Sequence, residues 1–245
     1  MMYIKKESVS TDAAQEIGRV KRDFEWDKVS KTDKEKARVA FDQLEKSFIR
    51  KQLFSEQKGI CAYCMRRISD DGSSTIEHWL PISADATQAL EYSNMMLSCD
   101  GGRKTGNENA RRVLSCDAAK EDNTIKISPY NKDQMAKIRY NRDGYLYIYP
   151  KDSELQNDID YVLKLNGEID KNGKKISDTS NGLVRGRKQV YQYYERYIKN
   201  LDKRGKALEG AIRKKINEIT DSEEYPEFAG VWLYFLNRKI RQAKM

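Results

Sequence analysis

The pattern of apolar and polar positions predicts helices at both ends of the chain and short strands between them. Near the N-terminus, residues 11–26 fit a helix with Ser10 or Thr11 as its N-cap. Residues 32–57 predict one long helix, which starts at a capping-box sequence and ends before Gly59. Its apolar positions recur at helical spacing: Val39 or Ala40, Leu44, Phe48 and Leu53.

Short apolar runs in the middle of the chain predict strands and turns. Residues 74–76 fit a strand that leads into Glu77 and His78, and Pro81 ends it because proline cannot continue a ladder. A helix is expected to begin at Cys116 or Asp117. The other expected features are a strand at 3–4, a helical turn at 85–90, an apolar run at 95–97, a strand at 125–129, a hairpin at 137–149 turning at Asp143–Gly144, and a loop-rich stretch at 151–181 turning at Asn172–Gly173.

Apolar residues at helical spacing return in the last third of the chain. Residues 184–220 predict a helical region that Gly205 and Gly210 weaken as one continuous helix, and residues 226–242 predict a last helix that closes the core. The first region carries cations opposite its apolar stripe, which favours a solvated face over a binding surface. These cations are Arg196, Lys199, Lys203, Arg213 and Lys214.

The elements together predict an α+β protein that is mainly helical. Three segments are expected: an N-terminal helical segment at 1–57, a cysteine-containing module at 58–125, and a C-terminal hairpin and helical region at 126–245. A chain of 245 residues is long enough to bury a sizeable core.

The chain is basic, with a net charge of +8 and a pI of about 9.1. Such a balance favours an anionic partner, most commonly nucleic acid, although it also serves general solubility. No signal-peptide pattern and no apolar run of membrane-spanning length is present. We therefore expect no membrane partner and a cytoplasmic location.

All four cysteines and the only histidine lie between residues 61 and 116. Cys61-x-x-Cys64 has the spacing at which two thiolates bind one tetrahedral Zn²⁺ from a tight turn, and Cys99 and Cys116 would complete a closed, structural site. Four free cysteines and a redox pair are the alternatives, but no thioredoxin-like pattern surrounds the pair. Cys99 and Cys116 are 17 positions apart, so the basic, glycine-rich loop at 101–109 is expected to bulge out between them.

Glu77 and His78 supply groups that phosphodiester hydrolysis needs. The reaction requires an activated water and a Lewis acid on the phosphate oxygens. Histidine suits the first task, and carboxylates suit the second because Mg²⁺ prefers hard oxygen ligands. A lone histidine is more often structural, but this one adjoins a carboxylate and lies between the cysteine pairs.

The sequence Glu77-His78, Asn94 and Cys116-Asp117-x-x-Lys120, threaded with the cysteines, resembles an HNH endonuclease over about 60 residues. Such domains have a ββα-metal fold, in which a hairpin is followed by a helix and both surround one divalent ion. In zinc-bearing members, two cysteine pairs bind a zinc ion that holds the hairpin and the helix together. A longer resemblance is to the PtuB nucleases, bacterial antiphage proteins of Septu and retron-linked systems. It rests on Gln57-x-Gly59-Ile60-Cys61-x-Tyr63-Cys64, Ile76-Glu77-His78-x-x-Pro81, Tyr92-x-Asn94-Met95-Met96-Leu97-Ser98-Cys99-Asp100-Gly101-Gly102, Cys116-Asp117-x-x-Lys120, Ile127-Ser128-Pro129 and Leu163-x-Leu165-Asn166.

The resemblance implies a role for each residue of the HNH pattern. His78 would be the general base, Glu77 and Asp117 would bind a catalytic Mg²⁺ or Mn²⁺, and Asn94 would brace the loop between the hairpin strands. Lys120 would contact phosphate or stabilise charge, although the same position on a helix also fits a surface lysine. Asn107 or Asn109 is the alternative to Asp117 as a ligand.

The resemblance also implies partners. These are a nucleic-acid substrate, a PtuA-type ATPase that regulates the nuclease and, in retron-linked systems, a reverse transcriptase with its RNA–DNA complex. Two other functions remain open: a non-catalytic zinc-stabilised subunit that binds nucleic acid or protein, and a structural subunit of a larger complex. The sequence does not distinguish DNA from RNA as substrate, since no base-reading motif is visible.

Overall fold

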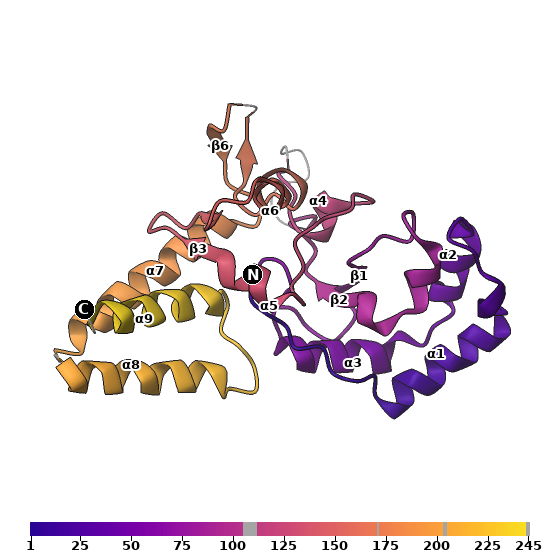
Figure 1. The fold of residues 1–245 in the computed structure, drawn as a ribbon, viewed down its shortest axis with the longest axis horizontal. Helices are drawn as coiled ribbons and strands as arrows, with labels where there is room; N and C mark the ends of the chain where they lie inside the picture. Colours follow the sequence, from indigo (N-terminus) through magenta and orange to yellow (C-terminus); the bar gives the residue numbers. More distant parts are fainter. Residues whose placement is uncertain (105–111, 171, 203–204, 244–245) are drawn as a thin grey trace.

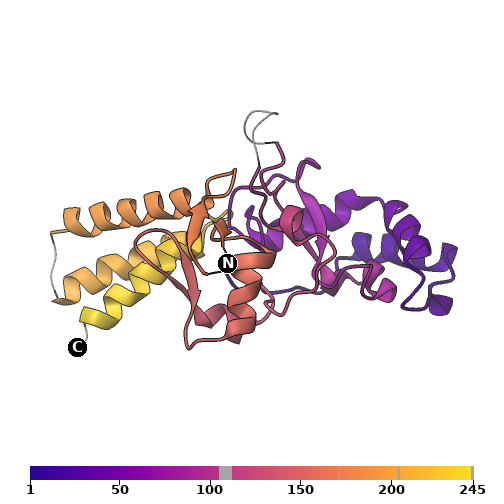
Figure 2. The ribbon, with the colours of Figure 1, turned by 90° about the horizontal axis from the view of Figure 1, so that it is seen from above.

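The computed structural model describes residues 1–104, 112–170, 172–202 and 205–243. It is an α+β protein, about half helical, with small antiparallel sheets. The chain is elongated, with α1–α3 towards one end, α7–α9 at the other, and β1, β2 and α4 between them (Figures 1 and 2). One continuous hydrophobic core joins these parts, from Leu53 through Leu97 to Leu236. No helix among the described residues is long and apolar enough to span a membrane.

The N-terminal helices cover one side of the central hairpin. Ser10 caps the first of them, as predicted, by accepting a hydrogen bond from the Ala13 N–H. No strand forms at residues 3–4, where the Ile4 N–H makes a single backbone bond to the Pro129 carbonyl. The helical elements here are α1 (Thr11–Asp23), the 3₁₀ turn η1 (Trp26–Lys28), α2 (Lys34–Asp42) and α3 (Lys46–Gln57).

The single helix predicted at 32–57 is wrong, because the chain breaks between α2 and α3. Residues of α1 bind the backbone between these two helices: Arg19 donates to the Gln43 carbonyl, and Glu16 accepts from the Glu45 N–H. The break turns the second helix relative to the first. Of the alternatives Val39 and Ala40, Ala40 is buried and Val39 is 51% exposed. The predicted core residue Phe48 is 44% exposed, while its neighbour Ile49 is buried.

The central hairpin follows the predicted pattern. β1 (Thr75–His78) pairs antiparallel with β2 (Met95–Ser98), and Glu77 lies opposite Met96 and His78 opposite Met95. The long connection between the strands contains two 3₁₀ turns, of which the first matches the turn expected at 85–90. After the excursion that follows β2, the chain forms one short helix. These elements are η2 (Ala86–Leu90), η3 (Tyr92–Asn94) and α4 (Asp117–Lys120).

The segment after α4 contains both confirmed and wrong predictions. The hairpin of β3 (Ile138–Tyr140) and β4 (Leu146–Ile148) forms as expected, and Gly144 supplies its turn with a φ of +89°. No strand forms at 125–129, because the N–H groups of Lys126 and Ile127 donate to the Asp158 carboxylate rather than to a strand. The stretch at 151–181 is more regular than predicted. It holds α6 (Ser153–Asn157), the π-helical turn η4 (Asp158–Val162), β5 (Glu168–Ile169) and β6 (Lys175–Ser177). A further helix, α5 (Lys132–Lys137), directly precedes β3.

Three helices close the molecule at the other end. The predicted helical region is two helices rather than one, and α9 packs on both of them and on β3. Arg196, Lys199, Arg213 and Lys214 are exposed, as the solvated-face interpretation predicts, whereas Lys203 lies outside the described residues. The helices are α7 (Leu183–Asn200), α8 (Gly205–Thr220) and α9 (Ala229–Ala243).

Candidate zinc centre and adjoining pocket

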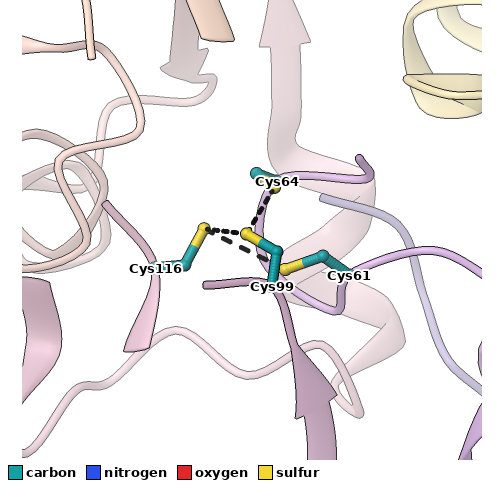
Figure 3. Close-up of side chains that lie close together, drawn as sticks. All are labelled: Cys61, Cys64, Cys99 and Cys116. Carbon is teal, nitrogen blue, oxygen red and sulfur yellow. Dashed lines mark hydrogen bonds between the residues drawn. The ribbon is translucent and has the colours of Figure 1, made fainter. Parts of the chain in front are cut away.

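Four cysteine side chains from separate parts of the central module converge on one point. Cys61 and Cys64 come from the turn after α3, Cys99 from the end of β2, and Cys116 from the residue before α4. All four are buried free thiols, and their sulfurs lie within 4.8 Å of one another. Figure 3 shows the sulfurs turned towards one another. The segment 61–116 therefore holds a candidate metal site.

The spacing of the sulfurs fits a tetrahedral ion. The Sγ–Sγ distances are 3.6 Å for Cys64–Cys99, 3.8 Å for Cys99–Cys116 and 4.0 Å for Cys61–Cys116. Zinc with four sulfur ligands at about 2.3 Å would separate them by about 3.8 Å. Burial raises the pKa of Cys116 well above its usual value, so a metal that binds here displaces that proton. The donor set and its geometry both suit Zn²⁺.

The excursion between Cys99 and Cys116 is closed at its base. Gly101 is buried with a φ of +63°, and its carbonyl accepts a hydrogen bond from the Ser115 N–H at 3.0 Å. Cys116 then adopts a φ of +57° and donates its N–H to the Leu163 carbonyl. These contacts return the chain to the cluster. Residues 105–109 of the predicted basic loop, with the alternative ligands Asn107 and Asn109, lie outside the described residues.

The return of the chain places Asp117 beside Glu77. Both carboxylates line a pocket of about 320 Å³ together with His78 and Lys120. Burial raises the pKa of Glu77 to about 8; the Lys120 charge opposes this shift, and a hydrogen bond with Asp117 adds to it. A hydrogen bond thus links the two carboxyl groups across the pocket. Paired oxygen ligands of this kind suit a divalent ion such as Mg²⁺.

Lys120 is buried, which excludes the alternative interpretation of a surface lysine. Its side chain is 1% exposed, and its ammonium lies 2.6 Å from Glu77 Oε1 and 3.0 Å from the His78 carbonyl oxygen. The four-residue helix α4 places it one turn after Asp117 and against the end of β1. Lys120 therefore contacts the two residues that the sequence singled out.

His78 is held in a defined orientation at the edge of the pocket. It is 8% exposed, its Nε2 lies 2.9 Å from the Ala89 carbonyl oxygen, and the Phe41 ring packs against it at 4.6 Å. Burial lowers the pKa of His78 to about 4, so the imidazole is neutral at pH 7. A neutral ring that donates from Nε2 carries its lone pair on Nδ1, where it can accept a proton.

Asn94 spans the connection between β1 and β2. Its side chain accepts from the Leu80 N–H at 2.8 Å and donates to the carbonyls of Leu80 and Gln88. The Trp79 N–H also donates to the Asn94 carbonyl at 2.9 Å. Asn94 thus ties both ends of the connection together, and it makes no contact with the carboxylates.

Three further residues at the pocket were missed by the sequence reasoning. Tyr63 donates a hydrogen bond from its hydroxyl to Glu77 Oε1 at 3.1 Å. Its position between Cys61 and Cys64 was the one sequence feature that could have placed it near the site. Arg103 lies 3.3 Å from Asp117 Oδ2, and Arg38 of α2 reaches the same pocket. Arg103 belongs to the basic loop that the sequence singled out, whereas Arg38 had no signal of its own, because the fold alone brings α2 to this pocket.

In comparisons with known proteins, no family model and no curated protein matches this chain.

Proposed function

We propose that this protein is a metal-dependent endonuclease of the HNH type. In this proposal β1, β2 and α4 form the ββα-metal module, and the four cysteines hold a structural zinc. The observation that carries the proposal is the pocket in which Glu77 and Asp117 meet beside a neutral histidine and a buried lysine. A zinc-stabilised binding module gives no reason for this arrangement.

Glu77 and Asp117 would hold the catalytic Mg²⁺ or Mn²⁺. Bound there, the ion would supply Lewis-acid stabilisation to the phosphate oxygens. The protein contributes the support of these ligands, since Tyr63 and Lys120 both contact Glu77 and Arg103 contacts Asp117. This support keeps both carboxylates in the pocket before any ion binds.

His78 acts as the general base. Its Nε2 is held by the Ala89 carbonyl, so Nδ1 is the atom that accepts the proton from the attacking water. The carbonyl contact fixes the tautomer and the ring orientation, and Asn94 supports the connection that carries Ala89. Lys120 acts by positioning Glu77 and the end of β1, because its buried ammonium is already occupied.

The biological setting follows from the resemblance to PtuB nucleases. We propose a role in bacterial antiphage defence together with a PtuA-type ATPase, with a retron reverse transcriptase and its RNA–DNA complex as a further partner in retron-linked systems. The net charge of +8 supports a nucleic-acid substrate.

The test is cleavage of end-labelled DNA and RNA by the protein with its ATPase partner, with Mg²⁺ or Mn²⁺ added or omitted. His78→Ala should abolish cleavage while zinc content and melting temperature stay close to those of the unmodified protein. Lys214→Ala, an exposed cation outside the pocket, is the matched control and should retain cleavage. Full activity of His78→Ala would refute the proposal. Binding of nucleic acid without metal-dependent cleavage would favour the non-catalytic zinc-stabilised subunit instead.

A further inference from the structure

A second groove shares no lining residue with the four cysteines or with the Glu77 pocket. It is formed where the N-terminal segment meets α5, β3 and α9, and its volume is about 510 Å³. This size is within the range of ligand-binding pockets. Figure 1 shows these elements gathered beside the N-terminus, near the middle of the molecule. The proposed cleavage chemistry makes no use of this groove.

The groove is lined by cations without carboxylates. Lys132, Arg139 and Arg241 line it, and no Asp or Glu does. Among the described residues, none of the three forms an ion pair: Arg139 donates only to the backbone carbonyls of Ala136 and Ile138. Unpaired cations around a concave surface raise the local concentration of anions. The groove is therefore complementary to a negatively charged ligand.

Aromatic side chains line the same groove. Tyr3 is 43% exposed, and Tyr234 is held by a T-shaped contact with the Tyr140 ring at 5.6 Å. Tyrosine rings provide stacking surfaces for unpaired bases, and stacking tolerates any base because each has a π-face. Rings and unpaired cations in one groove favour single-stranded nucleic acid over an inorganic anion.

The charge of the surrounding region agrees with this ligand. Residues 183–245, which include α9, contain 15 Lys and Arg against 8 Asp and Glu, so they carry +7 of the net charge of +8. Two of the acidic residues face the central module, where Glu224 pairs with Arg67 and Glu227 with Arg66. Because these two carboxylates are neutralised by arginines outside the segment, the rest of the surface of residues 183–245 is more basic than the composition of the segment suggests.

We propose that this groove binds single-stranded nucleic acid, with phosphates on Lys132, Arg139 and Arg241 and a base stacked on Tyr3 or Tyr234. This inference rests on the proposed function only in taking nucleic acid as the ligand, and the binding itself requires no cleavage. The groove would hold an unpaired strand of the substrate through residues other than those proposed for cleavage.

The test measures binding of fluorescent oligothymidine and oligouridine to the zinc-loaded protein without added Mg²⁺ or Mn²⁺. Lys132→Gln/Arg241→Gln should weaken binding about tenfold at physiological salt and make the log Kd–log salt slope shallower by about 1.4, since each phosphate contact contributes about 0.7. Lys206→Gln/Lys214→Gln removes the same charge from exposed positions outside the groove and should change the Kd less than about twofold. Tyr3→Leu should weaken binding about fivefold or more without changing the slope.

Equal losses of oligonucleotide affinity in the two double variants would overturn the proposal, because they would show only a general effect of net charge. Unchanged oligonucleotide binding by the groove variant, with loss of binding to polyglutamate, would also overturn it and assign the groove to an acidic protein partner. Oligonucleotide binding through the groove in a protein that cleaves nothing would support the groove and refute only the nuclease. A preference between the two oligonucleotides would identify the substrate as DNA or RNA.

Discussion

Replacing Gly101 with alanine tests whether the excursion from Cys99 to Cys116 must be packed tightly to form the metal site. A Cβ at Gly101 would lie 2.2 Å from the Ser115 carbonyl oxygen and 2.4 Å from Ala118 Cβ. Both distances are about an ångström or more shorter than the 3.4 Å at which ordinary contact begins. Neither atom belongs to a flexible side chain, so the substitution must move the segment that carries Cys116 and Asp117.

The expected cost has two parts. The left-handed φ of +63° costs a non-glycine residue about 1–2 kcal/mol. Overpacking of a closed site adds about 1–3 kcal/mol. Gly101→Ala should therefore lower the free energy of unfolding by about 2–5 kcal/mol, which is a large part of the stability of a typical domain.

Gly72→Ala is the matched control, because Gly72 has a φ of +91° and a Cβ added there would have no atom within 4 Å. It should show the backbone cost alone, about 1–2 kcal/mol. The assay is urea unfolding of both variants in excess zinc, together with zinc bound per chain. If Gly101→Ala loses no more stability than Gly72→Ala and keeps its full zinc, the excursion does not shape the site and the reasoning fails.

Three other predictions concern single groups at the two sites. Cys116→Ser should weaken zinc binding at least about 100-fold, since even the loss of an outer-shell partner costs 10–100-fold; competition with a chromophoric chelator measures it. His78 has a pKa of about 4 when folded and 6.5 when unfolded, so the unfolded chain takes up the proton first as pH falls. The protein should then lose about 2 kcal/mol of stability between pH 7 and 5 relative to His78→Gln, by urea unfolding at each pH. Lys120→Met should raise the pKa of Glu77 further, so its destabilisation, up to about 3–5 kcal/mol, should be larger at pH 9 than at pH 6 by the same measurement.

Each of these has an outcome that contradicts it. Unaltered zinc affinity in Cys116→Ser would remove that thiol from the site. Parallel stability–pH curves for the unmodified protein and His78→Gln would mean that the imidazole is not buried in its neutral form. A destabilisation by Lys120→Met that does not depend on pH would show that Lys120 acts through packing rather than through the charge of Glu77.

The sequence predicted the elements whose signals are local. Ser10 caps α1, Asp143–Gly144 turns the β3–β4 hairpin, and Cys61-x-x-Cys64 indicated the metal site, because caps, turns and knuckles depend on a few adjacent residues. It failed where distant residues intervene. Glu16 and Arg19 break the helix predicted at 32–57, and Asp158 takes the N–H groups that a strand at 125–129 would have used. No periodicity within either segment could reveal those partners.

The candidate site divides in the same way. Glu77, His78 and Asp117 could be singled out because their residue types match the chemistry. The environment of these residues could not be predicted. Lys120 looks like a surface residue on any helical wheel, and Arg38 comes from a helix more than thirty positions before Glu77. Burial of these groups depends on the whole central module, and burial is what sets the pKa values of Glu77 and His78.

The adjacency of Cys116 and Asp117 makes the two sites one mechanical unit. Cys116 is the residue before α4, Asp117 begins that helix, and Lys120 ends it, so a shift of the cysteine moves the carboxylate and the ammonium together. Ser98 reinforces the link, because its hydroxyl lies 3.7 Å from Cys61 Sγ and 3.5 Å from the Asp117 N–H nitrogen. Loss of zinc should therefore disturb the partners of Glu77 without touching Glu77 itself. In the proposed nuclease, a metal with no role in the chemistry would still control whether the chemistry occurs.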